Sequence, residues 1–222
     1  SGANLTNLPS DVTVATSAPG SPSAGDLWFD STTGVTAMKV YNGTGWDQLS
    51  NKFSATGGSV TTYSSGGNSY TVHTFTSSAT FIAAENGTID ILMIGGGGAG
   101  GGVNDGGGGA GGMIVATNYN VDAGDYSLVI GAGGAAMRGH SQGAATSSGA
   151  NTTGFSMIAK GGGGGSWHGY HDGYDGGSGG GGGHSPNPNG GSSTQANYSY
   201  SGATINTYGN DGGDSGYDNP YL

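Results

Sequence analysis

Short apolar stretches recur along the chain with polar or glycine-rich residues between them, and they predict β-strands. Residues 70–75 (YTVHTF) and 79–83 (ATFIA) alternate between polar and apolar side chains, the period of a half-buried strand. Residues 89–94 (IDILMI) are apolar enough to predict a buried strand. Further strands are expected at 27–29, 37–41, 46–49, 113–116, 126–130 and 155–159. No convincing amphipathic helix appears, so the chain is predicted to be all-β.

Glycine runs follow three of these strands directly. IDILMI leads into Gly95, YSLVI into Gly131, and FSMIA into Lys160 and Gly161. Polyglycine is usually a flexible linker, but a linker needs no strands on both sides. Ordering it requires a geometry that offsets the large entropy loss of glycine. Polyproline-II-like segments packed side by side supply one, because they have three residues per turn and only glycine fits the crowded position. We therefore expect segments of one chain to pair through backbone N–H and C=O groups.

The first part of the chain predicts a separate small unit. Residues 1–10 are polar with spaced leucines and are expected to end an attachment segment. Residues 11–52 hold three of the predicted strands with the turn sequences STTG and NGTG between them, which predicts a three-stranded meander. A meander of this size is only marginally stable on its own, so we expect it to oligomerise or to pack on a neighbour. Residues 53–222 form the glycine-rich β domain, with Tyr-, Gly- and Asn-rich loops from about residue 161.

The strands and glycine runs together carry a resemblance. The series HTFTSSATFIAAENGTIDILMIGGGGAGGG, GGGGAGGMIVATNYNVDAGDYSLVIGAGGAA and GFSMIAKGGGGG resembles the glycine-rich domain of phage tail-fibre and adhesin proteins over roughly residues 69–183. The resemblance implies a β-sandwich with polyglycine-II-like packed loops, placed near the tip of a fibre. Residues 11–52 are similar to a small module of tail-fibre proteins, and SGANLTNLP resembles the joints of trimeric fibres.

Composition narrows the possible partners. Fourteen acidic residues face four basic ones, which gives a formal charge of −10 and argues against nucleic acid and anionic membranes. Only 8% of residues are charged, so disorder by charge repulsion is not expected. Glycine accounts for 53 of 222 residues without a strict Gly-X-Y period, which excludes collagen. Cysteine is absent, which excludes disulfides and thiolate metal sites. No apolar run predicts a transmembrane segment.

The sequence gives little support for a catalytic site, a nucleotide-binding site or a metal-binding site. The glycines after residue 94 lack the Gly-Lys-Ser/Thr signature and the following helix of a phosphate-binding loop. His168, His171, Asp172 and Asp175 have metal-compatible spacing, but an exposed loop without metal is the favoured interpretation. No pair of carboxylates is predicted to be held rigidly enough for glycoside hydrolysis. We therefore expect no enzyme, no cofactor and no metal.

Aromatic residues give the stronger functional indication. They gather in the last quarter of the chain amid Gly, Ser, Asn and Asp, a composition that resembles antibody binding loops and suits sugar rings. The equally weighted alternative is that these tyrosines pack over the glycine surface. The receptor-binding candidates are Trp167, His168, Tyr170, His171, Asp172, Tyr174, Asp175, Tyr198, Tyr200, Tyr208 and Tyr217.

These observations lead to one functional hypothesis and its alternatives. We expect an extracellular virion protein at a fibre or tail-fibre tip, which binds a host receptor (a glycan or an outer-surface protein) noncovalently and multivalently. Its expected partners are copies of itself in a homotrimer and other fibre or tail proteins. The main alternative is a purely structural virion decoration or extracellular filament subunit. Ice binding is disfavoured, because the irregular glycine runs offer no flat Gly-X-X face.

Overall fold

The computed structural model describes residues 12–32, 37–49, 53–102, 105–135, 146–166, 171–184 and 188–216. The chain divides into two compact units, residues 1–52 and 53–222, and each is described by itself. The described residues contain strands and no helix, which confirms the all-β prediction. None of them forms a helix that is long and apolar enough to cross a membrane.

The first unit is a four-stranded sheet in the order β1-β2-β3-β4. The predicted meander is present, with antiparallel pairing of β2 to β3 and of β3 to β4. The prediction of three strands was incomplete, because β1 pairs in parallel with β2. This strand covers only three residues, which is too short for the sequence pattern to predict it. The strands are β1 (Thr13–Ala15), β2 (Leu27–Asp30), β3 (Ala37–Tyr41) and β4 (Trp46–Leu49).

A buried tryptophan and an ion pair hold this sheet together. The Trp28 ring is 5% exposed, and its indole N–H donates to the carbonyl of Ala15 at 3.0 Å, which ties β2 to β1. Lys39 lies over the same ring and donates to the Asp30 carboxylate at 2.8 Å. This bond, with a second from Thr32, lowers the pKa of Asp30 from 3.8 to about 2. The aspartate therefore stabilises the folded sheet when it is ionised.

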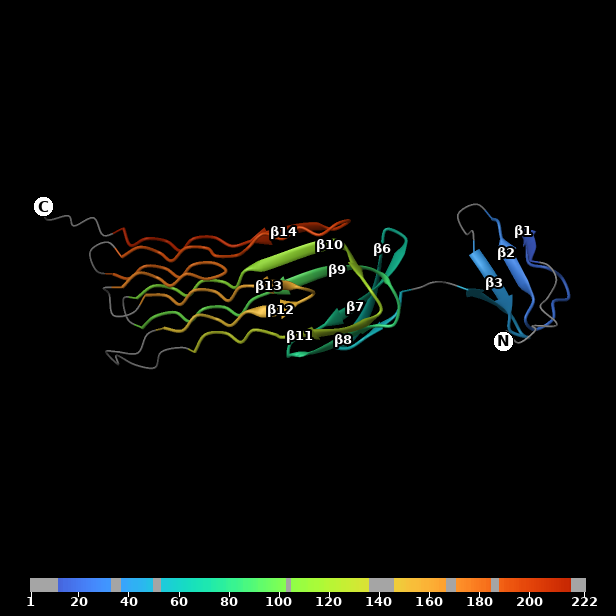
Figure 1. The fold of residues 1–222 in the computed structure, drawn as a ribbon, viewed down its shortest axis with the longest axis horizontal. Helices are drawn as coiled ribbons and strands as arrows, with labels where there is room; N and C mark the ends of the chain where they lie inside the picture. Colours follow the sequence, from blue (N-terminus) through green and yellow to red (C-terminus); the bar gives the residue numbers. More distant parts are fainter. Residues whose placement is uncertain are drawn as a thin grey trace, which may run out of the picture. The chain divides into compact units, whose positions relative to one another are not determined.

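The second unit contains the remaining strands in several small sheets. One sheet has the order β14-β10-β9 and another the order β11-β8-β5, while β12-β13 and β6-β7 are two-stranded. The strands are β5 (Ala55–Thr56), β6 (Ser59–Ser65), β7 (Asn68–Thr74), β8 (Ala79–Ala83), β9 (Gly87–Ile94), β10 (Met113–Val121), β11 (Gly124–Leu128), β12 (Thr152–Gly154), β13 (Met157–Ala159) and β14 (Thr204–Tyr208). Figure 1 shows them gathered at one end of the unit.

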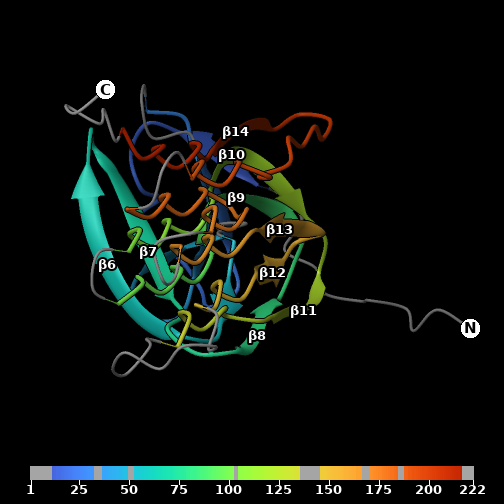
Figure 2. The same cartoon turned by 90° about the vertical axis from the view of Figure 1, so that its left-hand side faces the viewer.

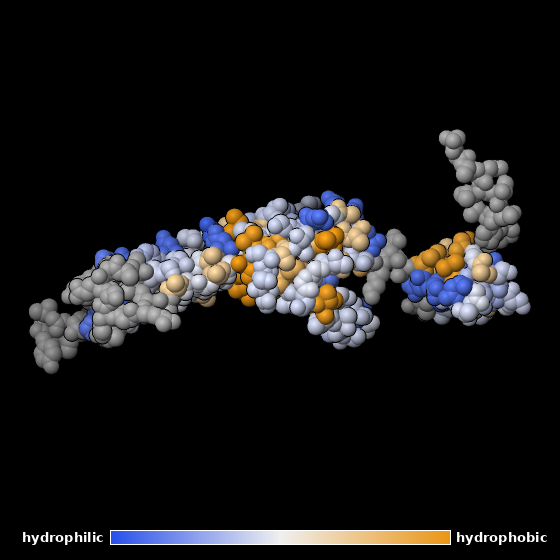
Figure 3. Space-filling model, turned by 90° about the horizontal axis from the view of Figure 1, so that it is seen from below, coloured by the Kyte–Doolittle hydropathy of each residue, from blue (hydrophilic) through white to orange (hydrophobic). Residues whose placement is uncertain are grey.

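The inward faces of these strands form one apolar core. Ile114, Ala116 and Met157 are at most 1% exposed and lie in the same cluster as Phe81 and Ile91. The prediction of a buried strand at 89–94 was wrong for one face, because Leu92 is 63% exposed. The outer side of β9 is left uncovered by the rest of the described chain, so apolar residues reach the surface there. Figure 3 shows the hydrophobic residues of the unit gathered in one part of its length, on the face that is turned to the viewer.

A left-handed turn replaces part of one predicted strand. Residues 155–159 were expected to be extended, but Phe155 and Ser156 have φ of 50° and 58° and join β12 to β13. Such a conformation costs non-glycine residues about 1–3 kcal/mol each. Packing offsets this cost, because the Phe155 ring contacts Phe81 and Tyr126 at centroid distances of 5.7 and 5.0 Å. Tyr200 also donates from its hydroxyl to the carbonyl of Ser156 at 2.8 Å.

The glycine runs form an ordered bundle beyond the strands. In Figure 1 they extend side by side away from the sheets, and Figure 2 views them end on. The amides of Gly95, Gly98 and Gly101 donate to carbonyls of the returning segment at Gly112, Gly109 and Gly106. The pairing advances by three residues at each step, which is the period of polyglycine II. The expected pairing between segments of one chain is therefore confirmed. The bundle consists of segments 95–102, 105–112, 131–135, 146–151, 160–166, 171–176, 178–184, 188–194 and 209–216.

Close backbone approach explains the glycines of this bundle. A Cβ atom on Gly162 would lie 2.0 Å from the carbonyl oxygen of Gly109, and one on Gly98 would lie 2.0 Å from that of Gly163. Neither clash can be relieved by a side-chain rotation, because both partners are backbone atoms. Gly107 differs, since a Cβ there would meet nothing within 4 Å. Alanine is therefore tolerated only at positions where its Cβ atom meets no neighbouring backbone, as at Gly107.

The ion pair of the first unit predicts a pH-dependent stability. The folded pKa of Asp30 lies below its ordinary value, so its stabilising contribution is complete above about pH 4 and is lost as the pH falls through about 2. We expect Asp30→Asn to lower the stability of this unit at pH 7 and to remove its acid-dependent loss. Denaturant unfolding followed by tryptophan fluorescence measures both effects, with Asp47→Asn as control. If Asp30→Asn lost stability at low pH as much as the wild type does, Asp30 would not be the group responsible for this loss.

The bundle predicts a sharp contrast between two alanine substitutions. Gly162→Ala should lower the free energy of unfolding of the second unit by at least about 2 kcal/mol, because the added methyl group meets a backbone carbonyl. Gly107→Ala should change it by less than about 0.5 kcal/mol. Urea unfolding of both variants, followed by far-UV circular dichroism, checks the difference. Equal effects would show that the glycine runs are not packed as described.

Candidate functional site

The predicted receptor-binding residues fall into two groups. His171, Asp172, Tyr174 and Asp175 lie on one bundle segment, while Tyr198, Tyr200 and Tyr208 lie near or within the strands. The remaining candidates are outside the described residues: Trp167, His168, Tyr170 and Tyr217. The described candidates therefore do not form one continuous cluster.

The aspartates of the first group bond to the backbone of a neighbouring segment. Asp172 accepts a hydrogen bond from the amide of Asn189 at 2.7 Å, and Asp175 accepts one from the amide of Ser192 at 2.6 Å. Both carboxylates thus replace the carbonyl groups that a further glycine segment would offer. Within the described ranges, no three His, Asp or Glu side chains are placed to hold a metal ion.

A second pair of aspartates bonds to the same segment. Asp211 accepts from the amide of Ser193 at 2.6 Å, and Asp214 accepts from the amide of Gly190 at 2.8 Å. The amides of Gly191 and Thr194 donate to backbone carbonyls instead. Every amide from residue 189 to 194 therefore has an acceptor. This role of the aspartates was not predicted from the sequence, although the spacing in DGYD and DGGD matches the three-residue turn of the bundle.

Two candidate tyrosines take part in the packing of the strands. The Tyr198 hydroxyl accepts from the amide of Ile158 at 2.9 Å, and the Tyr200 ring contacts the Tyr119 ring at 5.3 Å. Both rings pack against the apolar core. These contacts hold residues 198–200 onto the β12-β13 hairpin. The expected alternative was that the tyrosines pack over the glycine surface, but these two pack on the apolar core of the strands instead.

The other two described tyrosines are more exposed. Tyr208 is 49% exposed and lies on β14 opposite Met113, on the outer side of its sheet. Tyr174 is 38% exposed and lies within the bundle, where its main-chain N–H donates to the carbonyl of Gly164. Tyr174 therefore has a rigid backbone and an accessible ring, which is the arrangement that a binding residue requires.

Segments from distant parts of the sequence are joined at the far end of the bundle. Gly101 bonds to Gly106 there, and the amide of Ser166 donates to the carbonyl of Gly181. The Ser166 side chain is fully buried, and its hydroxyl accepts from the amide of Gly106 at 3.0 Å. These bonds tie segments 95–102, 105–112, 160–166 and 178–184 together at this end of the bundle.

Comparison with known proteins identifies the second unit. Residues 71–221 match a family model described as a glycine-rich domain. No curated protein and no solved structure matches the chain. The family match covers strands β8 to β14 and the bundle segments, whereas β5 and β6 lie before it.

The carboxylate contacts predict a local effect on amide exchange. Replacing Asp175 and Asp211 together by alanine should speed hydrogen exchange at Ser192 and Ser193 and cost about 1–2 kcal/mol, because two amides lose their acceptors. The double asparagine variant is the control, since its amide oxygens can still accept. Exchange measured by NMR that stays slow in the alanine variant would show that these carboxylates do not hold the segment.

Proposed function

Because the chain belongs to the glycine-rich domain family, we propose that it is a virion fibre or tail-fibre tip protein that attaches noncovalently to a host cell surface. The observation that carries the proposal is the bundle, in which paired glycine segments such as 95–102 and 105–112 bring chain reversals to one end. In this proposal the receptor is a glycan or an outer-surface protein. The first unit links the chain to other fibre or tail proteins, and copies of the chain form a homotrimer.

Rigidity supports a binding role for the bundle end. A loop that is already ordered loses less entropy when it binds, so a fixed base increases affinity without adding contacts. The bundle supplies such a base with backbone bonds alone, and Asp172 and Asp175 complete it at its margin. Several tips on one particle would then combine weak single-site affinities through effective concentration. The charge of −10 favours a neutral or basic receptor over nucleic acid.

A structural role is the second candidate, and a specific observation favours it. Tyr198 and Tyr200 bond through their hydroxyls to the β12-β13 hairpin, so part of the tyrosine-rich tail serves packing. In that case the chain would decorate a virion or build an extracellular filament. Antibody labelling viewed by electron microscopy separates the two, because a decoration lies along a shaft or shell and a binding protein lies at a tip.

Cell binding tests the proposal directly. Serine in place of Trp167, His168, Tyr170, His171 and Tyr174 should abolish binding of the fluorescent chain to host cells while its unfolding transition stays unchanged. A variant with Tyr63→Ser and Tyr70→Ser is the control, because these tyrosines are exposed on β6 and β7 and are not candidates. Flow cytometry over a panel of bacterial strains gives the measurement. Equal binding by both variants would reject residues 167–174 as the receptor-binding surface.

A further inference from the structure

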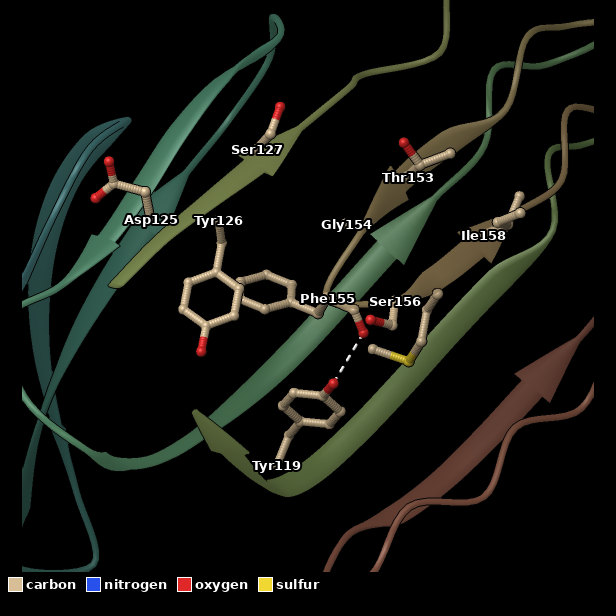
Figure 4. Close-up of a pocket in the computed structure, with 10 residues that line it drawn as sticks. Tyr119, Asp125, Tyr126, Ser127, Thr153, Gly154, Phe155, Ser156 and Ile158 are labelled. Carbon is tan, nitrogen blue, oxygen red and sulfur yellow. Dashed lines mark hydrogen bonds between the residues drawn. The ribbon is translucent and has the colours of Figure 1, made fainter. Parts of the chain in front are cut away.

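A hollow opens on the second unit, and none of the residues that line it belongs to a bundle segment. It lies between β11 and the β12-β13 hairpin and has a volume of about 510 Å³. This volume falls within the range of about 300–1,000 Å³ that is typical of small-molecule sites. Figure 4 shows the residues that line it, with the Tyr126 and Phe155 rings at its centre.

The hollow arises because the neighbouring strands β11 and β12 diverge. β11 and β12 are joined by hydrogen bonds in both directions between Val129 and Thr153. Because main-chain groups alternate along an antiparallel strand, those of Ser127 and Asp125 face the same side as those of Val129. Among the described residues, nothing pairs with the amides of Ser127 and Asp125 on that side. The opening therefore presents backbone donors and acceptors along one edge.

Polar side chains line this opening. The carboxylate of Asp125 and the hydroxyls of Ser127, Thr153 and Ser156 line the hollow, and none bonds to another described residue. In Figure 4, Asp125 and Ser127 project from β11, and Thr153 projects from β12 on the opposite side. A ligand in the hollow would meet hydrogen-bonding groups from two sides.

Fixed aromatic rings line the inner wall of the hollow, and the Tyr126 ring lies on the opposite face of β11 from the Asp125 and Ser127 side chains. The Tyr126 and Phe155 ring centroids are 5.0 Å apart with an interplanar angle of 31°, and both side chains are partly exposed. The Tyr126 hydroxyl accepts from the amide of Asp122 at 2.9 Å, and the Tyr119 hydroxyl donates to the carbonyl of Phe155 at 2.8 Å. These bonds hold the rings before any ligand arrives. The left-handed turn at Phe155 and Ser156 directs the Phe155 ring into this position.

We propose that this hollow binds one ring of a neutral saccharide. A pyranose ring has an apolar C–H face that packs on aromatic rings, and its hydroxyls match carboxylate, hydroxyl and backbone groups. Asp125 and the net charge of −10 disfavour acidic sugars and phosphates. The unpaired edge covers only Asp125 to Ser127, too short for an added peptide strand, which needs a row of ladder bonds. The site is separate from the bundle end, so the inference does not depend on the proposed function.

NMR titration of the full chain tests the inference. Methyl β-D-glucopyranoside and methyl β-D-galactopyranoside are the probes, with N-acetylneuraminic acid as the acidic comparison. We expect at least one neutral glycoside to shift the amides of Ser127, Phe155 and Ser156, with a Kd on the order of millimolar because the ligand is small. The acidic sugar should shift them at least about tenfold less at equal concentration, because Asp125 repels it.

Two variants and a control make the test specific. Asp125→Ala should weaken glycoside binding by about tenfold or more, since a hydrogen bond to a charged group is lost. Glu85→Ala removes the same charge elsewhere and should leave binding unchanged. Ser127→Trp should fill the hollow and abolish binding, with the unfolding transition of each variant checking its fold.

Three outcomes would overturn the proposal. The first is that neither glycoside shifts these amides up to about 100 mM, well above the affinity expected for a ligand of this size. The second is that the same shifts persist in Ser127→Trp. The third is that a threonine-valine hexapeptide shifts these amides while neither glycoside does, which would replace the saccharide by an added strand.

Discussion

The second unit depends on backbone atoms approaching more closely than any side chain permits. At Gly98 and Gly162 the neighbouring main chain occupies the place of a Cβ atom, so hydrogen bonds form directly between bare segments. Glycine loses more conformational entropy on ordering than other residues. The bundle offsets that loss with a dense set of N–H to C=O bonds, each worth about 1 kcal/mol net. One misplaced methyl group would therefore disturb several segments at once.

The apolar core of the strands and the aspartates hold different parts of this arrangement. Strands such as β9 and β13 lead directly into bundle segments, so the apolar core fixes where each segment starts and in which direction it runs. At the margin, carboxylates from neighbouring segments accept four amides, those of Asn189, Gly190, Ser192 and Ser193. The acidic composition of the tail thus has a structural cause. Hydrophobic burial orders the start of the bundle, and charge-assisted hydrogen bonds order its edge.

Much of the fold could be predicted because its signals are local. The alternation in 79–83 and the turn sequence NGTG gave β8 and the β3-β4 hairpin, and the strand-to-glycine junctions gave the polyglycine packing. Strands with weaker patterns were missed, such as β1 and β14, because tertiary pairing rather than local pattern makes them strands. The left-handed turn at Phe155 was missed because it exists only through contacts with Phe81 and Tyr126.

The candidate site was harder to predict for the same reason. Sequence composition alone cannot tell Tyr174, whose ring is exposed, from Tyr200, whose hydroxyl bonds to the β12-β13 hairpin. The two tyrosines differ in where the folded chain places them. The fold also brings Asp125 and Phe155, which are distant in the sequence, to the lining of one hollow. No sequence motif predicts this hollow. In this fold, a candidate binding site forms where segments that are distant in the sequence come together.

Amide hydrogen exchange of the bundle glycines tests this account most directly. Gly98, Gly109 and Gly162 donate their amides to other segments, so they should exchange as slowly as the amides of the core strand β10. Exchange at the rate of an unstructured chain, with β10 still protected, would show that the glycine runs are flexible and would contradict the bundle as a rigid base.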